Sequence, residues 1–281
     1  MRAKTASFVT TALTLSLASF AANAYPALPG LSNLDFTAYT GSTPKNYFTN
    51  VDPTGWTYGN QGGLVFVASP TSGHDATNNP NATYYAPSVI SGLGNYNYVQ
   101  ADGNPYYESG FGTTVKGLTA GNWYTLSFYQ AASQQVGYGG ATTNQWVVAL
   151  GQTGSSLYSA SASNPSSPNS SCGTNCVYVD TDPTASIDAS HLMDVPSQGL
   201  YDWEYTSVNL RANSTTETLS FLAWGNNGNT TNLPPMAFLT AVNAQPGLLP
   251  EPASLAVLGV GIAGIGNVMR RRRAARRAPK A

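Results

Sequence analysis

The chain has 281 residues, of which only 9% are charged, and its formal net charge is −1. An average soluble domain carries roughly 25% charged residues, so this composition suits an extracellular β protein better than a cytosolic enzyme. Residues 25–249 contain three basic and twelve acidic side chains, a net charge of −9, with no cluster of Lys or Arg. Because binding to nucleic-acid phosphates needs such clusters, we exclude DNA and RNA as partners.

The N-terminal 24 residues have the three parts of a secretory signal peptide. A positively charged start precedes an uncharged apolar run over residues 8–20, and Ala22 and Ala24 form a small-residue cleavage site. We therefore expect a cleavable signal over residues 1–24 and a mature chain that begins at Tyr25. The alternative is an N-terminal anchor that is not cleaved.

Residues 25–249 are expected to form one β-sandwich body, with its core over about residues 55–243. Short apolar and aromatic runs alternate with clusters of Gly, Pro, Asn, Ser and Thr, which is the pattern of strands and turns. Residues 151–174 are rich in Ser and Asn and predict a long loop. The strand signals lie at residues 63–69, 96–100, 122–130, 145–150, 219–224 and 237–243.

Alternating apolar positions predict which face of two of these strands is buried. In the strand at residues 122–130, Tyr124, Leu126 and Phe128 share one face. In the strand at residues 219–224, Leu219 and Phe221 share one face. Many short strands without helices favour an all-β sandwich.

Aromatic residues next to polar loops are the candidate ligand-binding residues. An aromatic ring stacks on a sugar ring while amide groups bind its hydroxyls. Tyr106 and Tyr107 follow an Asn-Pro pair, and Trp224 is followed by the polar loop that begins at Asn226. Aromatic residues in strands more often belong to the core, so the two loop tyrosines are the better candidates.

The two cysteines, Cys172 and Cys176, lie four positions apart. In an oxidising compartment the simplest interpretation is a disulfide that closes a tight loop. Free thiols are the alternative. A zinc site needs four ligands, and the distant His74 and His191 do not complete a convincing set.

No catalytic motif is evident. Neither histidine belongs to a hydrolase signature. Glycosidases need two converging carboxylates, for which the candidates are Asp180, Asp182, Asp188, Asp194, Asp202 and Glu204. We therefore expect a protein that is not an enzyme and needs no cofactor; Asp180 and Asp182 are the candidate ligands of a Ca²⁺ ion.

The order of signals resembles the galactose-binding-like jelly roll of some carbohydrate-binding modules. The resemblance rests on Gly55-Trp56, on the run from Val115 to Phe128, and on the closing strand after Pro234-Pro235. It implies a jelly-roll β-sandwich that binds carbohydrate. This chain departs from that pattern at Thr240, where such domains often have Asp.

The C-terminal residues 250–281 have three parts in a fixed order. Pro250, Glu251 and Pro252 precede an uncharged apolar run, and a basic cluster follows directly. The run covers residues 253–269, the short limit for a transmembrane helix. The cluster contains Arg270, Arg271, Arg272 and Arg273. Arginines after an apolar helix hold that end in the cytoplasm, which places the body across the membrane.

This tail resembles the PEP-CTERM sorting signal. The resemblance implies that an exosortase recognises the Pro-Glu-Pro segment and removes the helix, after secretion and transient anchoring in the inner membrane. The protein then reaches the cell surface or extracellular matrix of a Gram-negative-type bacterium. A permanent single-pass tail is the alternative.

Three hypotheses for the body follow. The first is non-catalytic binding of exopolysaccharide. The second is a structural or adhesive matrix component without a defined ligand. The third, an exported glycoside hydrolase, has the least support because no catalytic motif is evident.

Overall fold

We describe the protein from a computed structural model. The structure describes residues 25–39, 53–58, 65–68, 87–88, 90, 93–105, 110–168, 176–226 and 234–243. The predicted signal peptide, the sorting tail, Tyr106, Tyr107 and Cys172 lie outside these residues. Within them the chain forms strands only, and none of its segments is a helix that could cross a membrane.

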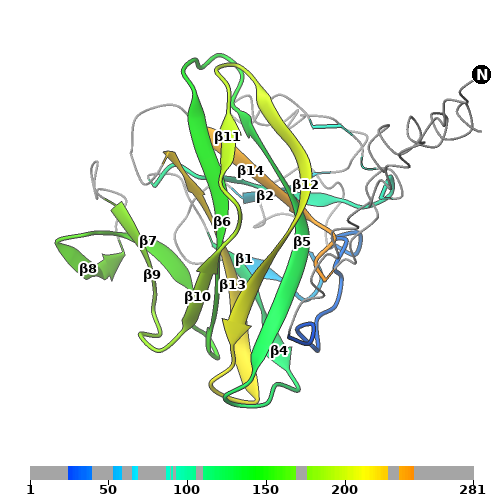
Figure 1. Ribbon diagram of the computed structural model, residues 1–281, viewed down its shortest axis with the longest axis vertical. Coiled ribbons are helices and arrows are strands. Elements are labelled where there is room, and N and C mark those ends of the chain that lie inside the picture. The colour runs from blue at the N-terminus through cyan, green and yellow to red at the C-terminus, as the bar shows by residue number, and fades with distance from the viewer. Residues whose placement is uncertain are drawn as a thin grey trace, which may run out of the picture.

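Two antiparallel sheets face each other across the main core (Figure 1). The six-stranded sheet has the order β1 (Thr57–Tyr58), β4 (Phe111–Lys116), β13 (Thr216–Gly225), β6 (Thr142–Gln152) and β10 (Ser186–Ala189), with β11 (Met193–Val195) also paired to β6. The five-stranded sheet has the order β12 (Leu200–Arg211), β5 (Trp123–Gln134), β14 (Pro235–Thr240), β3 (Tyr98–Asp102) and β2 (Val65–Ala68). These two sheets confirm the prediction of an all-β sandwich.

A smaller three-stranded sheet stands beside the six-stranded one (Figure 1). Its order is β8 (Asn164–Pro168), β7 (Leu157–Ser161) and β9 (Cys176–Asp180). The predicted long loop over residues 151–174 is therefore wrong, since β7 and β8 lie within it. The Asn, Ser and Pro residues of β8 give no apolar alternation, and in β7 the larger residues Leu157 and Tyr158 are adjacent in sequence and do not alternate. Backbone pairing holds both strands, Leu157 also belongs to a buried apolar cluster with Trp224, and the prolines of β8 are tolerated because β8 is an edge strand.

The main core lies between the two large sheets. The predicted inward residues Tyr124, Leu126, Phe128, Leu219 and Phe221 all belong to it, which confirms both alternation patterns. Full burial of an apolar side chain of this size contributes about 1.5–3 kcal/mol. At its centre, the fully buried Trp146 also donates a hydrogen bond from Nε1 to the Phe238 carbonyl (3.0 Å).

The segment from Tyr25 to Tyr39 completes the five-stranded sheet. β14 ends at Thr240, opposite Tyr129, so it does not pair with the first residues of β5. There the N–H of Thr125 donates to the Pro26 carbonyl (2.9 Å), and the N–H of Leu28 donates to the Thr125 carbonyl (3.1 Å). Leu28 is buried in the main core together with Phe36. The core thus includes residues well before the predicted start at residue 55.

Candidate functional site

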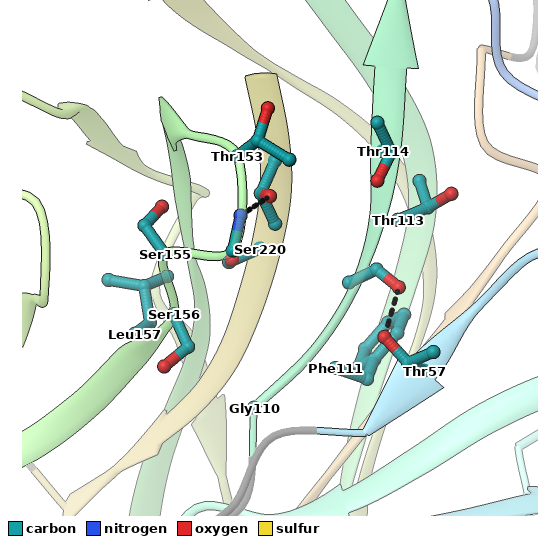
Figure 2. Close-up of a pocket in the computed structure, with 13 residues that line it drawn as sticks. Thr57, Gly110, Phe111, Thr113, Thr114, Thr153, Ser155, Ser156, Leu157 and Ser220 are labelled. Carbon is teal, nitrogen blue, oxygen red and sulfur yellow. Dashed lines mark hydrogen bonds between the residues drawn. The ribbon is translucent and has the colours of Figure 1, made fainter. Parts of the chain in front are cut away.

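A groove of about 420 Å³ lies on the outer face of the six-stranded sheet (Figure 2). Its floor is made by outward positions of β4 and β13. Gly112 pairs with Ser220, and Thr114 pairs with Thr218. Phe111 and Val115 alternate with these positions and point into the core. The strand period of two therefore produces a polar floor directly above an apolar core.

Two segments form the walls of the groove. On one side, the turn between β6 and β7 is fixed to the floor, because the Gly154 N–H donates to Thr218 Oγ1 (2.8 Å). On the other side, Thr57 of β1 donates from Oγ1 to the Gly112 carbonyl (3.5 Å). Figure 2 shows both bonds, with the open space between them. The lining residues are Thr57, Gly110, Phe111, Gly112, Thr113, Thr114, Thr153, Gly154, Ser155, Ser156, Leu157, Thr218 and Ser220.

Gly112 has a packing reason to be glycine. A Cβ atom built there would lie 2.5 Å from the Leu219 carbonyl oxygen, which belongs to the partner strand β13 and has no freedom to move away. The absence of a side chain keeps the floor flat and lets the two strands approach. Gly112 thus serves both strand pairing and the shape of the groove.

The lining is rich in hydroxyl groups and, among the described residues, contains no charged side chain. A Ser or Thr hydroxyl both donates and accepts hydrogen bonds, as a sugar hydroxyl does. None of these lining groups is an ordinary acid or base near neutral pH. The arrangement is able to bind a neutral polar ligand, and the described lining residues include no general acid–base pair.

The predicted calcium ligands Asp180 and Asp182 brace the wall of the groove. Asp182 Oδ2 accepts a hydrogen bond from the Gln152 N–H (2.8 Å), and its Oδ1 accepts from the Thr184 N–H (2.9 Å) and hydroxyl (2.7 Å). Asp180 Oδ1 accepts from the Asp182 N–H (2.8 Å). No group of three potential metal ligands occurs in the described part of the chain. These contacts favour a structural role for the pair.

The two carboxyl groups have opposite pKa shifts. Burial raises the pKa of Asp180, and the hydrogen bond from the Asp182 N–H only partly offsets it. For Asp182 burial also disfavours the charged form, but the hydrogen bonds from Gln152 and Thr184 outweigh it and lower the pKa. Asp182 is therefore the ionised anchor of this turn.

Trp224, a predicted sugar platform, is only 4% exposed. Its ring packs edge-on against Tyr178 of β9, with centroids 5.3 Å apart. This cluster joins the three-stranded sheet to β6 and β13, and a ring buried there does not present an open face to a sugar. Asn226 follows with a positive φ of 51°, in the left-handed region that Asn adopts more readily than most residues.

Two other predicted groups lie partly outside the described residues. Tyr106 and Tyr107 stay predictions; they precede Gly110, which lines the groove, by four and three positions. Cys176 is disulfide-bonded and buried. Its pairing with Cys172 stays a prediction.

The candidate acids and His191 lie outside the groove lining. Glu204 lies just after a bulge in β12 and accepts hydrogen bonds from Gln130 Nε2 (2.6 Å) and the Tyr201 hydroxyl (2.8 Å). His191 Nδ1 is 3.0 Å from Glu204 Oε1. Asp202 binds Ser88, and Asp188 accepts from the Asn209 N–H. These contacts join separate segments of the fold.

Sequence reasoning missed the groove because its residues are Ser, Thr and Gly, which are common throughout the chain. The alternation of Phe111 and Val115 with Gly112 and Thr114 was a usable signal for the strand. This signal does not reveal that none of the described strands covers the outer face at the groove, since that depends on where the three-stranded sheet lies.

The comparisons with known proteins begin with the C-terminus. Residues 249–273 match the PEP-CTERM protein-sorting motif, which confirms the predicted sorting signal. A motif of this kind indicates export and membrane-anchored sorting to the cell surface. No curated protein matches the sequence.

Two solved structures show a distant likeness in the body. The enzymatically active domain of tailspike protein 4 from bacteriophage CBA120 aligns with 10% identity and a TM-score of 0.32, over 76% of this chain and 21% of that chain. TmCBM61, solved in complex with beta-1,4-galactotriose, aligns with 12% identity and a TM-score of 0.27, over 67% of this chain and 86% of that chain. TM-scores this low identify neither a shared ligand nor a shared activity.

Proposed function

We propose that this chain is the precursor of an exosortase-sorted surface or matrix protein whose β-sandwich binds polysaccharide without catalysis. The sorting motif at residues 249–273 supports export and sorting to the cell surface. The single observation that carries the binding role is the uncharged, hydroxyl-lined groove on the outer face of the six-stranded sheet. We also propose that the sandwich is of the jelly-roll type, that residues 1–24 are removed, and that the apolar run 253–269 holds the precursor in the inner membrane before cleavage.

The groove has the size and chemistry of a saccharide subsite. Ligand sites in proteins typically measure roughly 300–1,000 Å³, and this groove falls within that range. Its glycines keep the floor open, and its hydroxyls match the donor and acceptor pattern of sugar hydroxyls. Tyr106 and Tyr107 are the proposed aromatic contacts, since the chain reaches the groove at Gly110 within a few residues of them.

The test is calorimetric titration of the full chain in detergent with neutral and acidic polysaccharides, including exopolysaccharide of the source bacterium. Thr114→Val removes one groove hydroxyl at nearly constant volume. A lost hydrogen bond of about 0.5–1.5 kcal/mol predicts roughly 2- to 13-fold weaker binding. Tyr106→Ala should weaken binding further if its ring stacks on the sugar.

Thr119→Val is the matched control, because Thr119 is exposed in the turn after β4 and lies outside the groove. It should leave the dissociation constant unchanged. Binding that survives Thr114→Val and Tyr106→Ala together would place the saccharide elsewhere on the body. A repeat with added calcium tests the metal considered at Asp180 and Asp182.

A structural or adhesive matrix role is the second candidate. The burial of Trp224 and Tyr98, at 4% and 5% exposure, favours it, because neither ring is presented to a ligand. A folded chain that binds no polysaccharide in the panel would support this role instead.

A further inference from the structure

Two exposed aromatic side chains stack on each other where β5 begins. Tyr25 and Trp123 are 40% and 41% exposed, with ring centroids 5.8 Å apart and planes inclined by 24°. Trp56, Trp146 and Trp224 are at most 4% exposed. The pair thus places a large apolar surface in solvent at one end of the sandwich.

The same end carries both described basic residues. Lys116 is the last residue of β4, and Arg211, the last residue of β12, pairs in register with Trp123. Both side chains are exposed. Arg211 donates from Nε to the Gly121 carbonyl (3.1 Å), and no ion pair to a carboxylate occurs for it within the described ranges. The same end also holds the carboxyl groups of Asp182 and Glu217, but these are buried at 6% and 1% exposure, whereas both basic side chains reach solvent.

The chain also heads toward this end before the sorting tail. β14 runs antiparallel to β5, and therefore toward Trp123. Beyond β14, the N–H of Asn243 donates to the Ser127 carbonyl (2.6 Å), and its Nδ2 donates to the Leu28 carbonyl (2.8 Å). Figure 1 shows the orange end of β14 beside the blue N-terminal segment. Nine residues, 244–252, separate Asn243 from the predicted helix, a reach of about 30 Å at most.

We propose that, while the tail still anchors the precursor, this end of the sandwich rests on the bilayer surface. Tyr25 and Trp123 lie at the headgroup level, where amphipathic aromatic rings are favoured. Lys116 and Arg211 lie against anionic headgroups, an attraction worth about 1 kcal/mol per basic residue near a charged surface. Removal of the tail ends the contact, because two rings and two cations alone give only weak membrane affinity.

A bilayer fits these observations better than a saccharide does. Each ring covers one face of the other, so the pair offers only the two outer faces for stacking. The nearby cations and the short connection to the sorting tail have no role in the binding of a neutral sugar. They are both accounted for by a membrane surface from which the tail emerges.

Brominated-lipid quenching of tryptophan fluorescence tests the proposal. All five tryptophans lie in the body and none lies in the tail, so the emission reports the body alone. The full chain is inserted through its tail into phosphatidylethanolamine and phosphatidylglycerol vesicles that carry bromine near the headgroups. We expect loss of the contribution of one tryptophan in five, and Trp123→Phe should abolish this loss. Lys116→Gln with Arg211→Gln should reduce it, as should added salt.

Trp203→Phe is the matched control, because this half-buried tryptophan contacts Tyr98 and Phe238 on the five-stranded sheet. It should leave the quenching unchanged. Quenching that persists in Trp123→Phe would overturn the proposal, as would no quenching in the wild type or failure of the chain to float with the vesicles. Protection of Trp123 by polysaccharide but not by lipid would overturn it in favour of a second saccharide site. The groove test is independent of every one of these outcomes.

Discussion

The outer faces of the two large sheets follow the same alternation but are covered differently. On the five-stranded sheet, Tyr98 and Trp203 pack together with Phe238 and form an aromatic layer. On the six-stranded sheet, Trp224 packs beneath Tyr178 of the three-stranded sheet, and the area beyond it is left open as the groove. The comparison teaches that outward polar residues become a candidate site only where no further layer covers them.

The largest expected effect on stability comes from Trp224, which packs between the six-stranded and the three-stranded sheet. Trp224→Ala should lower the free energy of unfolding by about 3–5 kcal/mol, because it leaves a cavity between β13 and β9. Chemical denaturation measures this. Trp123→Ala is the control: its ring is 41% exposed, so the loss should be well below that of Trp224→Ala. A stability-neutral Trp224→Ala would restore this residue as a ligand platform.

The second prediction concerns pH and a buried acid of the five-stranded sheet. Burial raises the pKa of Asp102 to about 7, and the hydrogen bond from the Asn104 N–H only partly offsets it. Because the folded-state pKa lies above the unfolded value of 3.8, the native state binds this proton more tightly. Its stabilisation is complete below about pH 4 and is lost as pH rises through about 7.

Thermal unfolding at about pH 4 and about pH 8 measures this loss, which is at most about 4 kcal/mol. Asp102→Asn cannot ionise and should flatten the dependence. The raised pKa values of Asp180 and Glu217, both mainly caused by burial, act with the same sign and should leave a residual slope. An unchanged slope in Asp102→Asn would show that Asp102 is not responsible.

The third prediction concerns Gly112, a floor residue of the groove on the six-stranded sheet. Gly112→Ala should cost about 1–3 kcal/mol, because the new Cβ meets the Leu219 carbonyl and strains the β4–β13 pair. It should also weaken polysaccharide binding. Gly139→Ala is the matched control, since a Cβ there meets only side-chain atoms at 3.6 Å and 3.7 Å. Equal stability of both variants would contradict the packing role of Gly112.

The smallest effect is expected where a loop is held against the five-stranded sheet. Asp202 accepts hydrogen bonds from the N–H (3.0 Å) and the hydroxyl (2.6 Å) of Ser88. Both groups are exposed, so Asp202→Ala should cost only about 1 kcal/mol. A double-mutant cycle with Ser88→Ala measures the coupling through the hydroxyl. Additive single effects would mean that this hydroxyl bond contributes nothing to stability.

Strong alternation made part of the fold predictable. The runs in β5 and β13 identified both the strands and their buried faces, because the apolar period of two is uninterrupted there. β12 was missed although it has twelve residues. Its first half is interrupted by a bulge between Tyr201 and Glu204, and polar residues there break the period. β7 escaped prediction because Ser and Ala fill buried positions that usually hold larger apolar residues.

The sequence by itself determined the sorting signal, because the sorting motif is a contiguous stretch with its parts in a fixed order. It also determined the all-β class, since alternation and turn residues are local properties. Only the tertiary structure decided that Trp224 is buried, that Leu28 and Phe36 join the core, and that hydroxyls of β4, β13 and the β6–β7 turn share one groove. The physical reason is that burial depends on which strands pack together, and those strands are far apart in the chain.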